Sequence, residues 1–169
     1  MTSTKNKAIF LDRDGVINEI IEHPELKDIK GKICKDPLNI KEFKIKKGIK
    51  KTIQNLRGAG YKIIIISNQP GLAKGFYKKE VLKQINVLIK KELNINHIYY
   101  CLHHPDYTKE CDCRKPKPGL LLKAAKEQKI DLNKSIMIGD QEKDIIAGKS
   151  AGCKTYLVKN GKIKINSFL

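Results

Sequence analysis

Short runs of apolar, mostly β-branched residues alternate along the chain with segments whose apolar residues recur at helical spacing. The runs predict strands over residues 8–11, 62–66, 98–101, 135–138 and 154–158. Helical spacing predicts a helix from residue 49 closed by glycines at 58 and 60, and others over 81–93, from 120, and from 145 to Gly152. This alternation favours an α/β, Rossmann-like parallel sheet with helices on both faces. Strands that are apolar throughout are typical of such doubly covered sheets.

Two stretches interrupt this alternation of predicted strands and helices. Residues 22–46 are rich in Lys, Asp and Pro, and residues 103–118 hold a cluster of cysteines. We predict that both are long loops, and long loops in compact domains tend to carry function. The chain has 169 residues, enough for one domain and barely enough for two. We therefore expect a single domain over 1–169, with no cap domain inserted between its motifs.

Polar residues follow three of the predicted strands at the point where each strand ends. These are Asp12, Arg13, Asp14 and Gly15 after the first, Ser67, Asn68 and Gln69 after the second, and Gly139, Asp140 and then Asp144 after the fourth. Because ligands bind beyond the carboxyl ends of the strands in open parallel sheets, we expect these groups to share one crevice. Carboxylates gathered there would repel one another unless a cation neutralised them, and oxygen ligands suit Mg²⁺.

The residue types in this crevice indicate phosphoryl transfer. Asp12 and Asp14 can divide the work, one carboxylate attacking and the other moving a proton. Ser67 and Asn68 offer neutral donors to phosphate oxygens, and Arg114 and Lys115 can spread the charge of the transferring group. Taken singly, each motif is more typical of a turn or a helix cap than of an active site. Their occurrence together at three strand ends favours catalysis.

A second group of residues has the spacing of a metal site. Cys101, His103, Cys111 and Cys113 supply three thiolates and one imidazole, a set that suits a closed, structural zinc site within residues 101–118. This spacing is less diagnostic than paired C-x-x-C motifs, and His104 competes with its neighbour as the nitrogen ligand. We expect His23 and His97 to be surface or packing residues, and Cys34 and Cys153 to be free thiols, the latter buried.

The charge of the chain is strongly positive. Lys and Arg number 35 against 18 Asp and Glu, giving a formal net charge of +17. This balance fits a polyanionic partner, but it fits a compositional bias better, because only three of the 35 are arginines. The apolar runs are too short to cross a bilayer, and no apolar export signal precedes the first strand. We expect a cytoplasmic protein that does not bind membranes.

Several segments resemble the haloacid dehalogenase (HAD) superfamily of phosphohydrolases. Residues 10–18 (FLDRDGVIN) resemble its first motif, and Ser67, Lys115 and Gly139-Asp140 match the other three. Residues 67–71 (SNQPG), 98–105 (IYYCLHHP) and 111–119 (CDCRKPKPG) are similar to the heptose bisphosphate phosphatases within it. The resemblance covers nearly the whole chain. It implies a Mg²⁺-dependent phosphatase acting on a small phosphorylated sugar, specifically the 7-phosphate of D-glycero-D-manno-heptose 1,7-bisphosphate.

The resemblance also implies roles for individual residues. Asp12 would be the nucleophile that forms an aspartyl-phosphate, and Asp14 the general acid and base. Asp12, the main-chain carbonyl of Asp14, and Asp140 would hold Mg²⁺. The transferring phosphoryl group would be bound by Ser67, Asn68 and Lys115, and the substrate by Arg114. Asp144 would either orient a lysine or a metal-bound water, or only cap the helix that follows.

The sequence departs from the resembled family in a few places. Pro70 and Leu72 replace the usual residues after Asn-Gln, and Lys74 stands where an arginine is usual, which bears on contacts to the remote phosphate. The basic loop 22–46 is longer than expected, and either binds that phosphate or is a solvated insertion.

Other functions remain as alternatives. The nearest is histidinol-phosphate phosphatase, and the high charge would suit a nucleic-acid 3′-phosphatase. A different class is a basic, zinc-containing nucleic-acid-binding module without catalysis. It leaves the acidic strand ends unexplained, and no aromatic platform interleaves with the basic residues. We expect a monomer with no nucleic-acid partner; the anomer of the sugar and the glycan it feeds, lipopolysaccharide or another, are not decided by the sequence.

Overall fold

A computed structural model describes residues 6–159 and residue 163. Its centre is a parallel sheet of β1 (Ala8–Leu11), β4 (Lys62–Asn68), β5 (His97–Cys101), β6 (Ile136–Gly139) and β7 (Lys154–Leu157). The strand order is β5-β4-β1-β6-β7, with β1 paired to β4 on one side and to β6 on the other. Phe10 of β1 lies in register with Ile64 and with Met137. The predicted parallel α/β sheet is confirmed.

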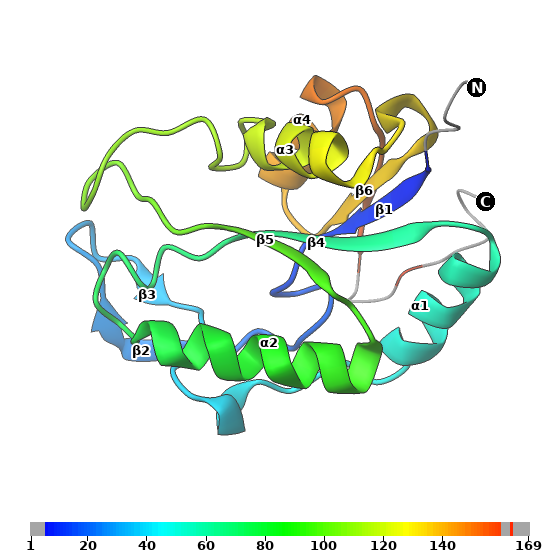
Figure 1. Ribbon diagram of the computed structural model, residues 1–169. Helices are drawn as coiled ribbons and strands as arrows, with labels where there is room; N and C mark the ends of the chain where they lie inside the picture. Colours follow the sequence, from blue (N-terminus) through cyan, green and yellow to red (C-terminus); the bar gives the residue numbers. More distant parts are fainter. Residues whose placement is uncertain (1–5, 160–162, 164–169) are drawn as a thin grey trace.

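Helices cover both faces of the sheet (Figure 1). Along one face lie α1 (Ile49–Gly58) and α2 (Lys79–Leu93), and along the other lie α3 (Gly119–Gln128) and α4 (Glu142–Ser150). Alternate residues of β1 pack on opposite faces of the sheet, because successive side chains of a strand point in opposite directions. Ile9 and Leu11 join the α1 and α2 core, whereas Ala8 and Phe10 join the α3 and α4 core.

The predicted boundaries differ from the observed ones at several ends. The strand expected over 62–66 continues to Asn68, so the polar pair that ends the motif still belongs to β4. Helix α4 starts at Glu142, three residues before the apolar run that marked it in the sequence. A capping box forms its first turn, in which Gln141 and Asp144 exchange side-chain and backbone contacts. Polar capping residues carry no apolar periodicity, so the pattern placed the start too late.

The sequence had suggested that the segment 22–46 is a plain loop, but the structure shows that it is not. It contains an antiparallel hairpin of β2 (His23–Lys27) and β3 (Ile33–Cys34), followed by a short 3₁₀ turn, η1 (Ile40–Glu42). A second 3₁₀ turn, η2 (Leu132–Lys134), precedes β6. Strand β2 is mostly exposed and polar, so it lacks the apolar alternation that predicts a strand. The carboxylate of Asp28 accepts the backbone N–H groups of Lys30 and Lys32, both at 2.9 Å, and thereby fixes the hairpin turn.

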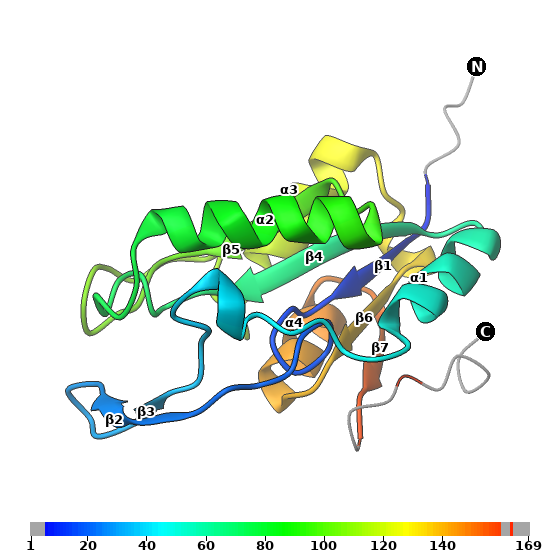
Figure 2. The same cartoon turned by 90° about the horizontal axis from the view of Figure 1, so that it is seen from below.

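The hairpin lies at the carboxyl end of the sheet. Figure 2 shows the arrowheads of β1 and β4 pointing toward the side of the molecule where β2 and β3 extend. The loop between β5 and α3, residues 102–118, reaches the same side. The crevice expected from the topology therefore has the hairpin and this loop as its walls.

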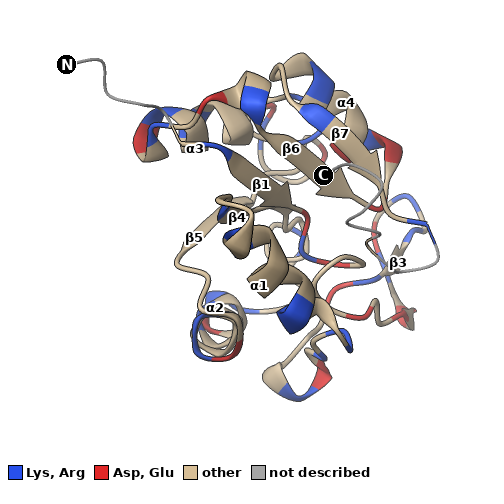
Figure 3. Ribbon diagram, turned by 90° about the vertical axis from the view of Figure 1, so that its right-hand side faces the viewer, with Lys and Arg blue, Asp and Glu red and all other residues tan. Residues whose placement is uncertain are grey.

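The positive charge is spread widely. Lys and Arg positions appear on all four α-helices in Figure 3, interspersed with acidic positions on several of them. This distribution fits a lysine-rich composition better than a single basic stripe. None of the described helices is long and apolar enough to cross a membrane.

Candidate active site

Asp12 is the first residue after β1 and lies at the bottom of the crevice. Its backbone N–H donates to the carbonyl of Ile138 at 2.9 Å, which ties the end of β1 to β6. The side chain is almost wholly buried. Burial raises the pKa of Asp12 to about 6, an effect that Lys115 opposes and that Asp144 and Asp14 reinforce. A buried carboxylate with this environment is a common feature of functional sites.

Lys115 comes from the loop before α3 and reaches the end of β1. Its ammonium nitrogen lies 2.7 Å from Oδ1 of Asp12 and 2.7 Å from Oδ1 of Asp144, and it donates to the carbonyl of Ile66 at 2.9 Å. Burial alone would lower the pKa of Lys115, but the two carboxylates raise it above its usual value. Lys115 is therefore a fixed positive charge beside Asp12.

Asn68, at the end of β4, holds the backbone of Lys115 in place. Its amide nitrogen donates to the Lys115 carbonyl at 3.0 Å, and its oxygen accepts the Lys115 N–H at 3.1 Å. The neighbouring Ser67 is buried on the same strand, and its hydroxyl accepts a hydrogen bond from Gln69 at 3.0 Å. The predicted residues Ser67, Asn68 and Lys115 thus lie together, although both polar atoms of the Asn68 amide already contact Lys115.

Asp14 is held by donors on both of its carboxylate oxygens. Oδ1 accepts from Arg13 at 2.9 and 3.1 Å and from Asn18 at 3.0 Å, and Oδ2 accepts from Gln69 at 2.6 Å. Gln69 is wholly buried, and its own oxygen accepts from Arg13 and from the Tyr77 hydroxyl, each at 2.8 Å. These contacts fix the direction in which Asp14 points.

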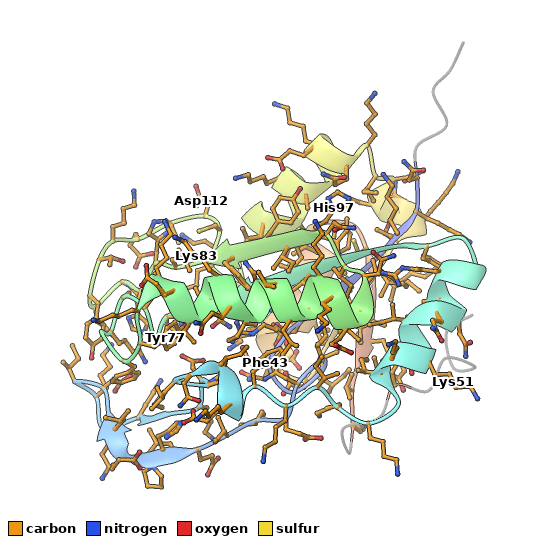
Figure 4. The ribbon with its side chains drawn as sticks, turned by 60° about the horizontal axis from the view of Figure 1, so that its bottom comes forward. Phe43, Lys51, Tyr77, Lys83, His97 and Asp112 are labelled. Carbon is orange, nitrogen blue, oxygen red and sulfur yellow. The ribbon has the colours of Figure 1, made fainter. Side chains whose placement is uncertain are left out.

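Arg13 is a functional-site residue to which the sequence reasoning gave no role, although it stands in the first motif. Its guanidinium is fully buried and lies over the rings of Phe43 and Tyr100, 5.7 and 5.6 Å from their centres. Burial opposes its charge, but Asp14 raises the pKa of Arg13 above its usual range. Figure 4 shows Tyr77 at the N-terminal end of α2 and Phe43 beside the same helix.

The acidic residues at the ends of β1 and β6 could hold a divalent cation. One carboxylate oxygen from each of Asp12, Asp140 and Asp144 lies within 4.8 Å of the others. Both oxygens of Asp144 already have neighbours, because Oδ1 lies 2.7 Å from the ammonium of Lys115 and Oδ2 accepts the Gln141 N–H at 3.1 Å. Among the described residues, Oδ1 of Asp140 is buried with neither a hydrogen-bond partner nor an ion pair. Asp12 and Asp140 are therefore the carboxylates that fit Mg²⁺, a hard cation that prefers oxygen.

Gly15 makes room for Asp140. It has a φ of +87°, and a Cβ added to it would lie 2.0 Å from Oδ2 of Asp140. A side chain at this position would be strained and would displace the carboxylate. The glycine of the first motif thus allows the backbone of the β1 loop to approach the β6 carboxylate closely.

A cavity of about 210 Å³ opens over these residues. Its lining includes the predicted site residues Asp12, Asp14, Ser67, Asn68, Arg114 and Lys115. The remaining wall includes four residues of the hairpin segment, Ile33, Cys34, Lys35 and Asp36, together with Lys74 and Lys143. The crevice is thus both acidic at its floor and basic at its rim, as a site for metal and phosphate requires.

The cysteine cluster forms a compact group beside the crevice. The sulfur of Cys101 lies 2.9 Å from that of Cys113 and 3.6 Å from that of Cys111, and Nδ1 of His103 lies 3.3 Å from Cys113. Ligand atoms of all four residues lie within 4.8 Å of one another. Three sulfurs and one nitrogen at these separations fit a structural zinc ion with four protein ligands.

His104, the alternative nitrogen ligand, lies outside this cluster. Its Nδ1 accepts the backbone N–H of Asp106 at 3.3 Å, and its ring contacts Tyr107 edge-on. The structure therefore favours His103. Cys34 and Cys153 are free thiols, as expected, and both are buried, although burial was expected only of Cys153.

The loop that carries the cysteines also contacts the hairpin. The backbone N–H of Ile29 donates to the Tyr107 hydroxyl at 2.7 Å, and Lys30 pairs with Asp106 at 2.7 Å. On the other side, Arg114 follows Cys113 directly and donates to the carbonyl of His103 at 3.2 Å. The cysteine loop therefore holds Arg114 at the crevice and also supports the hairpin that forms one wall of it.

Known proteins with similar sequences identify the family. The HAD-hydrolase-like family model matches residues 112–167. A D-glycero-beta-D-manno-heptose-1,7-bisphosphate 7-phosphatase of Pasteurella multocida is 40% identical over 166 residues, which cover 92% of this chain and 83% of that protein. The chain belongs to the heptose-1,7-bisphosphate 7-phosphatase family. It is a HAD-type phosphatase, a hydrolase of phosphoric monoesters.

Other members of the heptose-1,7-bisphosphate 7-phosphatase family agree. A D-glycero-alpha-D-manno-heptose-1,7-bisphosphate 7-phosphatase of Photorhabdus laumondii is 36% identical, covering 95% of this chain and 87% of that protein. The D,D-heptose 1,7-bisphosphate phosphatase of B. bronchiseptica was solved with magnesium and phosphate. It superposes with a TM-score of 0.71 at 28% identity, over 89% of this chain and 79% of that one. The resemblance seen in the sequence is confirmed.

Proposed function

We propose that this chain removes the 7-phosphate of D-glycero-D-manno-heptose 1,7-bisphosphate in a Mg²⁺-dependent reaction. The observation that carries the proposal is the placement of Asp12 and Lys115 2.7 Å apart at the bottom of a cavity that Asp14 and Ser67 also line. A carboxylate, a fixed cation and a second carboxylate at one spot are the groups that phosphoryl transfer through an enzyme aspartate needs. The identity of the sugar is inferred from the names of the relatives, which are heptose-1,7-bisphosphate 7-phosphatases.

In the first half-reaction, an oxygen of the Asp12 carboxylate attacks the phosphorus of the 7-phosphate. The bond from phosphorus to the sugar oxygen breaks, and the aspartyl-phosphate forms. The departing sugar oxygen takes a proton from Asp14, which lies two residues further along the same loop. Lys115 and Ser67 bind the oxygens of the transferring group, and the fixed charge of Lys115 offsets the negative charge that they carry.

In the second half-reaction, Asp14 takes a proton from a water molecule whose oxygen attacks the phosphorus. The bond to Asp12 breaks, and inorganic phosphate leaves. Mg²⁺, held by Asp12, Asp140 and the main-chain carbonyl of Asp14, would neutralise negative charge on the phosphoryl oxygens and on Asp12. Gln69 and Arg13 are positioning residues in this scheme, because they fix Asp14 without lining the cavity.

We further propose a chain that works as a monomer in the cytoplasm, without a cap domain and without a nucleic-acid partner. Three cysteines and a histidine grouped as zinc ligands suit a reducing compartment better than disulfides would. Lysines spread over all four helices favour a solvated surface over a nucleic-acid groove. The zinc site has four protein ligands, so it would stiffen the loop that delivers Arg114 and Lys115 and take no part in the chemistry.

Phosphate release tests the proposal. Purified protein with Mg²⁺ is given both anomers of D-glycero-D-manno-heptose 1,7-bisphosphate, histidinol phosphate, and a DNA duplex with a 3′-phosphate. We expect the highest kcat/KM on one of the heptose bisphosphates, and turnover lost in Asp12→Asn with the far-UV circular dichroism spectrum unchanged. A higher kcat/KM on histidinol phosphate would assign the alternative substrate. Equal activity of wild type and Asp12→Asn would show that the attacking group is another residue.

A further inference from the structure

Asp36 lies in the wall of the cavity but takes no part in the reaction scheme. It follows β3 and belongs to the arm that returns from the hairpin, and it lines the same cavity as Asp12 and Asp14. Its backbone is tied locally, since its carbonyl oxygen lies 3.8 Å from the Cys34 sulfur that donates to it. In the described part of the chain, its carboxylate has no hydrogen-bond or ion-pair partner.

Gly71, in the loop after β4, provides the space that the Asp36 side chain occupies. A Cβ added to Gly71 would lie 2.4 Å from Oδ2 of Asp36 and 2.4 Å from the Tyr77 ring. Asp36 is therefore placed against the backbone of the loop that follows Ser67 and Asn68. A carboxylate packed this closely into a wall has a fixed position relative to the floor of the cavity.

Within the described residues no ion pair joins Asp36 to a cation, although the positive charges of Arg13, Lys74 and Lys143 favour its ionised form. Three cationic side chains of the lining are already paired with other acids: Lys35 with Glu22, Lys74 with Asp28, and Lys115 with Asp12 and Asp144. Burial raises the pKa of Asp36 to about 6, and the negative charge of Asp14 adds to this effect. In its ionised form the carboxylate repels phosphate and accepts hydrogen bonds.

We propose that Asp36 binds hydroxyl groups of the substrate's sugar and thereby selects phosphosugars over phosphate esters that lack hydroxyls. An ionised, partly buried carboxylate gains most from donors, and sugar hydroxyls are the donors that a bisphosphorylated sugar offers. This inference rests on the proposed function, because it takes the transferred phosphate to be bound at Asp12.

The test compares two bisphosphates that differ in their hydroxyls. One is D-glycero-D-manno-heptose 1,7-bisphosphate and the other is pentane-1,5-diol bisphosphate, which has both phosphates and no hydroxyl. For Asp36→Ala we expect kcat/KM on the heptose bisphosphate to fall about 10- to 100-fold, the range typical of a lost hydrogen bond to a charged group. On the diol bisphosphate we expect it to stay within about twofold of wild type. Asp36→Asn, which keeps one acceptor oxygen, should lose less than Asp36→Ala.

Glu25→Gln is the matched control, because Glu25 is an exposed carboxylate of the same hairpin that contacts His23 and does not line the cavity. It should leave both substrates unaffected. The inference is overturned if Asp36→Ala loses activity equally on the two bisphosphates, which would indicate a role in the fold or in placing Asp14. It is also overturned if the variant loses activity on neither. A wild-type protein inactive on the heptose bisphosphate would instead refute the proposed function.

Discussion

The ammonium nitrogen of Lys115 lies 2.7 Å from Oδ1 of Asp144, and neither side chain is exposed to solvent. The other oxygen of Asp144 accepts the backbone N–H of Gln141 and closes the capping box of α4. Asp144 therefore performs both of the roles that the sequence left open, since it orients the lysine and also caps the helix. Through this residue, the position of Lys115 depends on the start of α4.

Asp144→Asn should weaken both the fold and the reaction. The variant leaves Lys115 with one carboxylate partner, Asp12, and breaking a buried ion pair costs about 3 kcal/mol of stability. With Lys115 drawn toward Asp12, we expect kcat to fall about 10- to 100-fold. Urea denaturation and steady-state kinetics measure the two effects. Glu142→Gln, an exposed change in the same turn, is the control, and equal stability of Asp144→Asn and wild type would contradict the account.

Gln69→Leu should lower kcat while leaving the affinity for phosphate nearly unchanged. The substitution removes the donor to Oδ2 of Asp14 and leaves the Tyr77 hydroxyl without its acceptor. Because Asp14 then loses its fixed direction, we expect about a 10- to 100-fold loss in kcat. Inhibition by inorganic phosphate reports the affinity. Gln128→Leu, which removes only a surface contact with Tyr99, should behave as wild type. A loss confined to KM would place Gln69 in substrate binding instead.

Gly15→Ala should weaken Mg²⁺ binding. The added Cβ would lie 2.0 Å from Oδ2 of Asp140, so the carboxylate must move away from Asp12. We expect the Kd for Mg²⁺, measured by calorimetry, to rise at least about tenfold. Gly48→Ala is the matched control, because Gly48 has a similar φ of +85° and open space around it. If both variants bind Mg²⁺ equally well, the approach of Gly15 to Asp140 does not matter for the metal.

Thiol titration should separate the cysteines into two groups. Burial raises the pKa of Cys34 to about 11 and that of Cys153 to about 12. Both thiols stay protonated at pH 8, and the thiolate is the reactive form, so they should react slowly in the folded protein at that pH. We expect one zinc ion per chain, and reaction of Cys101, Cys111 and Cys113 only after a chelator removes it. Five fast thiols in the zinc-loaded protein would contradict this assignment.

Much of the catalytic floor could be predicted because it lies at the ends of buried strands. Apolar runs located β1, β4 and β6, and parallel topology then brought Asp12, Ser67 and Asp140 to one edge. Lys115 was a candidate from its chemistry, but its contact with Asp12 could not be predicted, since the loop before α3 has no periodic pattern that fixes where its side chains point.

The walls of the cavity could not be predicted in the same way. The hairpin is polar and short, so neither its strands nor the direction of Asp36 leaves a pattern in the sequence. Gln69 and Arg13 act through contacts with each other and with Tyr77, residues that are near in space but partly distant along the chain. Such side-chain networks become visible only when the backbone has placed their members.

The hairpin turn is joined to the cysteine loop through Ile29 and Tyr107, whereas Asp12 and Asp140 directly follow the central strands β1 and β6. Insertions or exchanges in the hairpin could therefore change which sugars are admitted without disturbing the groups that break the phosphate bond. Substrate range and reaction chemistry would then be free to diverge separately within this family.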